Sequence, residues 1–212
     1  MINKFLGIEY SCDDTSVAIV SSDKNVIFHK TISQSYTTGV VPEIAARRHL
    51  HTLHDIVLDI NISDLQGIAA TFGPGLISSL MTGVNFAKGL SLAYGIPLYK
   101  VNHLEAHMLS VSLTEDIPYP YLSLLISGGH TQLVLVKSVH EFEILGNTID
   151  DALGECFDKI AKSIFRHRKK IQTHTHCEKN TEIKRANMVI DRRVTYKTPN
   201  VIGIYLPRKN KP

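Results

Sequence analysis

The sequence predicts an α/β fold built from two related lobes, of which the second is incomplete. Two observations lead to this class. Short apolar, β-branched runs open each of two parts of the chain, and strand and helix patterns alternate after them. The segment EDIPYP, at residues 115–120, separates the two parts, and the second part contains only one helical pattern.

The first lobe is expected at residues 1–115 and begins with three strands. Short apolar runs occupy residues 4–11, 16–22 and 25–33, and β-branched residues recur in them. The polar stretch SCDDT forms the first turn between these runs. We therefore expect a three-stranded meander at the head of this lobe.

Alternating helices and strands complete the first lobe. A helix is expected from Pro42 to residue 60, because proline favours the first turn and the apolar residues keep helical spacing. Those apolar residues are Ile44, Ala45, Leu50, Leu53, Ile56, Val57 and Ile60. A strand then leads into a Gly-Pro-Gly loop, and Gly95 and Pro97 end the helix that follows. A strand at 97–102 and a helix at 103–113 come last.

The second lobe is expected to begin at residues 116–163. Two strands within 121–138 enclose the turn Ser127–Thr131, and a third strand follows at 141–148. The amphipathic pattern at 149–164 predicts a helix with acidic residues in its first turn, where the helix dipole favours them.

The composition is that of a cytoplasmic globular protein. Hydrophobic residues make up 43% of the chain and charged residues 20%. No apolar run approaches the ~20 residues of a membrane span, and the first residues lack the features of a secretory signal. For this reason we expect no membrane partner. The three cysteines show neither ligand spacing nor an even count, so we expect no disulfides.

Residues 164–212 are expected to form a divergent, poorly ordered basic tail. They hold 13 Lys and Arg against 3 Asp and Glu, whereas residues 1–163 hold 10 against 17. A basic tail can bind RNA electrostatically, and His174, His176 and Cys177 are of metal-binding types. A frameshift or a divergent end explains the basic charge better, and chance in a polar tail explains these His and Cys residues better.

Two histidines one helical turn apart, His103 and His107, form the first candidate site. Residues i and i+4 share one helix face, so both rings could hold one metal ion. The alternative is an ordinary polar helix face. His49, His51 and His54 also share a predicted helix, and solvent-facing positions explain these three better than a ligand role.

The turns that head the two lobes form the second candidate site. The turn Ser11–Thr15 contains two aspartates, and the turn Ser127–Thr131 combines hydroxyl groups with two glycines. Glycines let backbone N–H groups approach an anion and hydroxyl groups add donors, so both turns suit a phosphate. Aspartates beside such a site can position a metal ion or water. Ordinary hairpin chemistry is the alternative.

Six motifs occur in the order and spacing of one protein family. They are GIEYSCDDTSVAIV, VVPEIAARRHL, FGPGL, NHLEAH, LLISGGHTQL and GNTIDDALGECFDKIAK, all within residues 5–163. On these motifs the chain resembles the tRNA N6-adenosine threonylcarbamoyltransferases, the universal threonylcarbamoyladenosine synthases formerly described as O-sialoglycoprotein endopeptidases. The resemblance implies an actin-like, sugar-kinase-like ATPase fold with a cleft between the lobes.

The resemblance also implies roles for individual residues. His103 and His107 match the family's metal ligands, with Fe²⁺ as the expected ion and Zn²⁺ as the alternative. Asp13 and Asp14 match acidic residues of the catalytic turn. The residues that match substrate contacts are Ile126, Ser127, Gly128, Gly129, His130 and Asp158.

The implied reaction moves a threonylcarbamoyl group from threonylcarbamoyl-AMP to N6 of adenosine 37 in tRNAs that read codons beginning with A. The implied partners are the tRNA, an inactive paralogous subunit and a small ATPase of the modification complex. The metal can act as a Lewis acid and template. Because an exocyclic amine is a poor base, we expect positioning to matter more than proton removal.

The chain departs from the family pattern at three places. Tyr10 stands where the family usually has Thr or Ser and adds bulk beside the turn. Ala106 replaces a usual Gly, which a helix accepts. Beyond Ile164 the family's Gly-Gly-Pro stretch and late metal-binding Asp do not occur. We therefore expect weak metal binding and little or no threonylcarbamoyl transfer by this chain alone.

Three other function classes compete with this prediction. A non-catalytic, actin-like partner subunit of the same complex is the main alternative, although a scaffold has no need of the histidine pair. Zinc peptidases of the common type need HExxH, whereas Leu104 follows His103 here. A small-molecule kinase of the same fold would not require the paired histidines.

Overall fold

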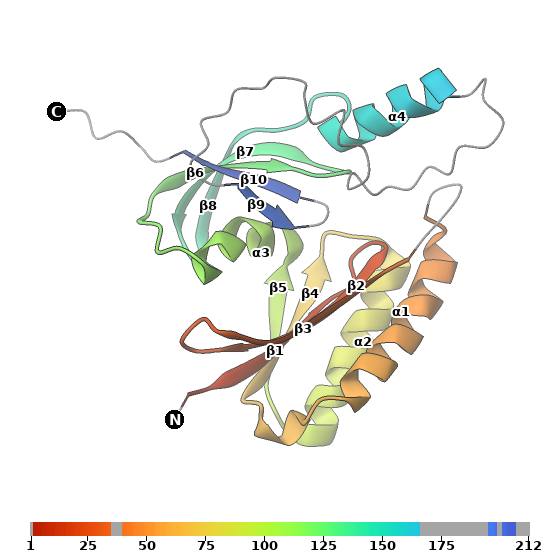
Figure 1. The fold of residues 1–212 in the computed structure, drawn as a ribbon, viewed down its shortest axis with the longest axis vertical. Helices are drawn as coiled ribbons and strands as arrows, with labels where there is room; N and C mark the ends of the chain where they lie inside the picture. The colour runs from red at the N-terminus through yellow and green to blue at the C-terminus, as the bar shows by residue number, and fades with distance from the viewer. Residues whose placement is uncertain (1, 35–39, 166–194, 199–200, 207–212) are drawn as a thin grey trace. The chain divides into compact units, whose positions relative to one another are not determined.

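The computed structural model describes residues 2–34, 40–165, 195–198 and 201–206 (Figure 1). The chain divides into two compact units, Met1–Ala106 and His107–Pro212. Each unit contains one five-stranded sheet with helices, so the predicted α/β class is confirmed. Within the described ranges, no helix combines the length and the apolar character that a membrane span needs.

The sheet of the first unit has the strand order β3-β2-β1-β4-β5. β1 (Lys4–Glu9), β2 (Asp14–Ser21) and β3 (Val26–Ser33) form the predicted antiparallel meander. β4 (Gly67–Gly73) pairs parallel with β1, and β5 (Leu98–Asn102) pairs parallel with β4. Because β1 is the central strand, the turn that follows it leaves from the middle of the sheet.

Two helices pack on this sheet. α1 (Pro42–Leu58) and α2 (Ile77–Tyr94) contact each other and the strands (Figure 1), and a 3₁₀ turn, η1 (Ile62–Asp64), precedes β4. α2 ends at Gly95, whose φ of 65° favours glycine. The core between helices and sheet consists of Leu6, Ile8, Tyr10, Val17, Leu53, Ile56, Ile62, Leu65, Ile68, Ala70 and Ala87.

The buried face of α1 includes a histidine. His49 has no exposed surface, whereas Leu50, from the predicted apolar set, is 47% exposed. The prediction that His49 faces solvent is therefore wrong, while His51 and His54 are exposed as predicted. The reason is helical spacing, since steps of three or four residues bring a single stripe of α1 against the core. That stripe consists of Ala45, His49, Leu53 and Ile56.

α3 (His103–Leu109) follows β5 directly, and a 3₁₀ turn, η2 (Ser110–Leu113), extends it. The predicted helix at 103–113 is thus confirmed, with a tighter final turn. Ala106 lies inside α3, as its high helix propensity allows.

The sheet of the second unit has the strand order β8-β7-β6-β10-β9. β6 (Tyr121–Ile126), β7 (Thr131–Ser138) and β8 (Glu141–Gly146) form the predicted second meander. β10 (Val201–Leu206) pairs antiparallel with β6, and β9 (Thr195–Thr198) pairs antiparallel with β10. The units therefore share the meander but differ beside it, where β4 runs parallel and β10 antiparallel.

The end of the second unit differs from the prediction. β9 and β10 lie within residues 164–212, where we predicted a poorly ordered tail. α4 (Leu153–Phe165) begins at Leu153 rather than at residue 149, because the Leu153 N–H donates to the Thr131 hydroxyl oxygen over 2.9 Å. Residues 166–194, with the predicted metal-binding types of the tail, lie outside the described residues. The predicted lobe limits stay predictions.

Candidate functional site

The turn between β1 and β2 packs against the loop after β4. The backbone N–H of Leu76 donates to the Ser11 carbonyl oxygen over 2.8 Å. A Cβ atom on Gly75 would lie 2.6 Å from the same oxygen, so a side chain there would displace the turn. The sequence motifs SCDDT and FGPG therefore meet in one place.

Glu9, the last residue of β1, connects this turn to α3. Its Oε1 accepts the Ser11 N–H at 2.6 Å, and its Oε2 accepts from His103 Nδ1 at 3.1 Å and from the Thr71 hydroxyl. Burial alone would raise the pKa of Glu9, but the bonds and charge of His103, together with Ser11 and Thr71, outweigh burial and lower the pKa to about 2. Glu9 is therefore a carboxylate at neutral pH.

The bond to Glu9 determines which nitrogen of His103 is protonated. A carboxylate can only accept, so Nδ1 carries the hydrogen, and the neutral ring keeps its lone pair on Nε2. The Ser11 hydroxyl oxygen lies 3.2 Å from the same Nδ1. Metal-binding histidines commonly donate their other N–H to a carboxylate. The surroundings of His103 therefore fit a ligand of a divalent metal ion.

His107 lies one turn after His103 on α3, and both side chains are partly exposed. Residues four apart share a helix face, and imidazole suits both Fe²⁺ and Zn²⁺. In the part of the chain that the structure describes, no group of three or more His, Cys, Asp or Glu side chains could hold a metal ion. The pair thus supplies suitable donors, but the described residues do not complete a metal site.

Asp13 and Asp14 close the turn, and both are partly buried. The Gln34 backbone N–H, after the end of β3, donates to the Asp13 carbonyl oxygen over 3.1 Å. Burial, and then the charge of Asp14, raise the pKa of Asp13. Two neighbouring carboxylates favour a cation or a hydrogen-bond donor beside them, because either one reduces their repulsion.

The thiol of Cys12, in the same turn, is not activated. The surrounding protein and the Asp13 carboxylate raise the pKa of Cys12 to about 12, although part of the residue is exposed. The thiol is therefore protonated at neutral pH.

Tyr10 fits into the first unit because α2 has a glycine beside it. The Tyr10 side chain has no exposed surface, and its hydroxyl has no hydrogen-bond partner among the described residues. A Cβ atom on Gly83 would lie 2.2 Å from two atoms of the Tyr10 ring. The bulk that the sequence places beside the turn is thus accommodated by α2, a pairing that the sequence did not predict.

The turn between β6 and β7, in the second unit, closes through Ser127. Its backbone N–H donates to the His130 carbonyl oxygen over 2.8 Å, and the His130 N–H donates to the Ser127 hydroxyl oxygen over 3.0 Å. Gly128 and Gly129 form the exposed tip, where an added Cβ atom would meet no atom within 4 Å. The protein itself therefore does not require these two glycines.

The start of α4 contacts this turn. A Cβ atom on Gly154 would lie 2.7 Å from the Ser127 carbonyl oxygen, which accepts the Gly154 N–H at 3.3 Å. Thr148, between β8 and α4, accepts the Thr131 N–H at 3.0 Å and donates to the Thr131 carbonyl oxygen at 3.1 Å. The motifs LLISGGHTQL and GNTIDDALGE therefore also form one structure.

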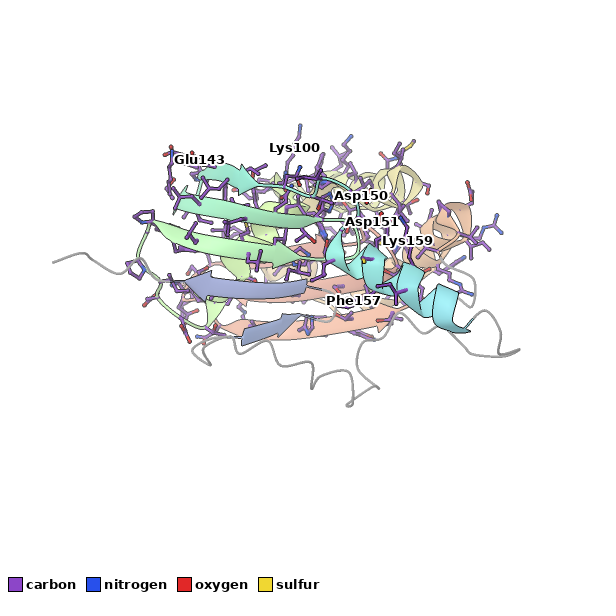
Figure 2. The ribbon with its side chains drawn as sticks, turned by 90° about the horizontal axis from the view of Figure 1, so that it is seen from above. Lys100, Glu143, Asp150, Asp151, Phe157 and Lys159 are labelled. Carbon is purple, nitrogen blue, oxygen red and sulfur yellow. The ribbon has the colours of Figure 1, made fainter. Side chains whose placement is uncertain are left out.

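An ion-pair group near the surface joins Asp151, just before α4, to the first two turns of the helix. Figure 2 shows Lys159 and Asp151, whose side chains pair, and Lys159 Nζ also lies 3.1 Å from Glu155 Oε1. Such exposed pairs contribute about 0–1 kcal/mol to stability. The side chain of the neighbouring Asp158 lies outside the described residues, so its predicted role as a substrate contact stays a prediction.

The structure connects some of the predicted site residues through shared hydrogen-bond partners, whereas others belong to the second unit. Within the first unit, the Asp13–Asp14 turn and His103 share Ser11 and Glu9 as connecting residues. The sequence signal for Glu9 was its position as the acid at the end of an apolar strand. The turn Ser127–Thr131 belongs to the second unit, so a common cleft for both turns stays a prediction.

A family model described as tRNA N6-adenosine threonylcarbamoyltransferase (TsaD) matches residues 24–198. The chain belongs to this family. The match to the threonylcarbamoyltransferase model continues beyond residue 163, where the motifs found in the sequence end, and it includes β9. Membership of this family, together with the observed strand order, confirms the predicted actin-like fold class.

Curated threonylcarbamoyltransferases show the same relationship. The protein of Brucella anthropi is 48% identical over 173 residues, which cover 75% of this chain and 48% of the relative. The protein of Rickettsia bellii is 50% identical over 173 residues, which cover 77% of this chain and 51% of the relative. The chain thus spans about half the length of these relatives.

Solved structures resemble the chain more distantly. YeaZ from Pseudomonas aeruginosa is 15% identical, covers 69% of this chain and 66% of its own, and has a TM-score of 0.44. The ethanolamine utilization protein EutJ from Carboxydothermus hydrogenoformans is 15% identical, covers 77% of this chain and 57% of its own, and has a TM-score of 0.46.

Proposed function

We propose that the chain acts in threonylcarbamoyl transfer to tRNA. The group would move from threonylcarbamoyl-AMP to N6 of the tRNA adenosine. The new bond joins N6 to the carbamoyl carbon, the bond from that carbon to the AMP phosphate oxygen breaks, and N6 loses a proton. The observation that carries this proposal is the Glu9–His103 pair beside the turn of Asp13 and Asp14, in a chain of the threonylcarbamoyltransferase family.

The metal ion of the proposed site would be held by His103 and His107, as Fe²⁺ or alternatively Zn²⁺. When bound, such an ion supplies a Lewis acid that orients and polarises an oxygen atom. Glu9 supports this role because it holds His103 by Nδ1, which orients the ring and makes Nε2 the nitrogen of the type that binds a metal ion. The described residues supply two donors of the expected type, so we expect weak binding by this chain alone.

The two turns would bind the substrate. The exposed tip at Gly128 and Gly129 has room for a phosphate near backbone N–H groups, which supports the proposed contact with threonylcarbamoyl-AMP. Ile126, Ser127, His130 and Asp158 would join this contact, and Asp13 and Asp14 would position a polar group of the reaction. Since exocyclic N6 is a poor base, the residues act mainly by holding the reactants in place.

The partners proposed for the chain are tRNA, the inactive paralogous subunit and the small ATPase of the modification complex, all in the cytoplasm. The alternative role, that of a non-catalytic subunit, would not explain why Glu9 binds and orients His103.

A transfer assay tests the proposal. The purified chain is incubated with tRNA, threonylcarbamoyl-AMP and the partner proteins, and the digested tRNA is examined for the modified nucleoside. We expect slow formation of the product, well below that of a relative of full length, and none with the His103→Ala/His107→Ala double variant. The matched control is His51→Ala, which removes an exposed histidine of α1. Equal product from the chain and from the double variant would contradict the proposal.

A further inference from the structure

The buried histidine of α1 holds both sides of the aspartate pair. His49 Nε2 lies 2.9 Å from the carbonyl oxygen of Cys12, the residue before Asp13. Its Nδ1 lies 2.7 Å from the hydroxyl of Thr15, the residue after Asp14. One rigid ring thus spans the two residues that flank the carboxylates, and it has no exposed surface.

The partners of His49 allow one tautomer. The Cys12 carbonyl oxygen can only accept, so Nε2 must carry the hydrogen. In the neutral ring Nδ1 then accepts, and both groups that face it, the Thr15 hydroxyl and the Gln34 side-chain amide at 3.3 Å, can donate. Burial favours the same neutral form, because it lowers the pKa of His49. The charges of Glu9, Asp13 and Asp14 act to raise this pKa, but burial outweighs them.

Further contacts tie His49 to the core. The Gln34 amide also donates to the Ala45 carbonyl oxygen of α1 over 3.3 Å, and the Ser79 hydroxyl of α2 reaches the Cys12 carbonyl oxygen at 3.5 Å. Two helices and the segment after β3 therefore converge on the backbone of the turn.

We propose that His49, in its neutral Nε2–H form, is a positioning residue that fixes the Asp13–Asp14 turn by bridging the Cys12 carbonyl and the Thr15 hydroxyl. Its importance for the reaction rests on the proposed function of Asp13 and Asp14. The bridge itself does not depend on that function, since it is a property of the folded first unit.

Nuclear magnetic resonance of the 212-residue chain tests the bridge. Long-range proton–nitrogen spectra identify which ring nitrogen of His49 is protonated, and carbon shifts follow the titration of the Asp13 carboxyl. We expect a ring protonated at Nε2 alone at neutral pH. A ring protonated at Nδ1, or at both nitrogens, would overturn the proposal.

Two variants separate the hydrogen bonds from the packing. His49→Leu keeps an apolar side chain and removes both bonds, so the amide signals of residues 12–15 should move and the Asp13 titration should change from that of the parent chain. His49→Gln retains a side-chain N–H for the Cys12 carbonyl and should restore most of the parent behaviour. His51→Leu, an exposed change on the same helix, should leave the turn unchanged.

Unchanged turn signals and an unchanged Asp13 titration in His49→Leu would overturn the proposal. If His49→Leu does not fold, the parent tautomer and the His49→Gln spectra decide in the same way. None of these measurements needs threonylcarbamoyl transfer. A failed transfer assay with an intact bridge would therefore refute the proposed function and leave the role of His49 in the turn standing.

Discussion

Gly83→Ala would place a methyl group inside the contact distance of the Tyr10 ring. The added Cβ atom would lie 2.2–2.3 Å from three ring atoms, and the ring cannot move into solvent because it is fully buried. Alanine in a helix normally gains about 1 kcal/mol over glycine, whereas overpacking a core costs about 1–3 kcal/mol. The difference of the two is a net loss of up to about 2 kcal/mol in the free energy of unfolding.

The same helix offers the control. Gly89 is also in α2, but an added Cβ atom there would meet no atom within 4 Å. Gly89→Ala should therefore gain about 0.5–1 kcal/mol. In a Tyr10→Ser background, Gly83→Ala should change from destabilising to stabilising, which gives a coupling energy of about 1–3 kcal/mol.

Urea unfolding followed by circular dichroism measures these changes. If Gly83→Ala were as stable as Gly89→Ala, the close packing of Tyr10 against α2 would be wrong. The same conclusion would follow if the effect of Gly83→Ala did not depend on the residue at position 10.

Three further changes test other parts of the structure. Tyr10→Phe removes a buried hydroxyl without a partner among the described residues, so the unfolding free energy should stay equal or rise by about 1 kcal/mol; a clear loss would reveal a bond of this hydroxyl. Gly154→Ala should cost about 1–3 kcal/mol in urea unfolding because of its contact with Ser127, whereas Gly129→Ala should stay within about 0.5 kcal/mol; equal effects would contradict the packing of α4 on the turn. The third test is the pH dependence of stability. The pKa of His49 is lowered in the folded chain, so as pH falls the unfolded chain takes up a proton on this histidine first. The free energy of unfolding therefore decreases as pH falls below about 6.5, by at most about 1.4 kcal/mol per pH unit. Unfolding curves of the chain and of His49→Gln between pH 7.5 and 5.5 measure this, and parallel pH dependences would contradict it.

The strands and helices were predictable because their signals are local. The runs that form β1, β2 and β3 are short and β-branched, and Pro42 opens α1 where the sequence places it. The ends of the elements were harder to predict from the sequence, since α4 starts where Thr131 provides a hydrogen-bond partner for the Leu153 N–H. That partner is 22 residues away, beyond the range of helix periodicity.

The connecting residues of the site were not predictable from local pattern. Glu9 gains its role from His103, 94 positions later, and His49 gains its role from Cys12, 37 positions earlier. A histidine on a helix with polar neighbours indicates a solvent-facing position until its distant partners are known. Likewise, the pairing of β10 with β6 joins parts of the chain that periodicity treats separately.

Metal binding by the purified chain tests the proposed site most directly. Zn²⁺ titration by calorimetry, with X-ray absorption at saturation, should show one site with imidazole nitrogens about 2.0–2.1 Å from the ion. His103→Ala and His107→Ala should each weaken binding at least about tenfold, Glu9→Gln should also weaken it, and His51→Ala should not. If both single histidine variants bound the ion as tightly as the parent chain, α3 would not hold the metal, and the proposed site would be refuted.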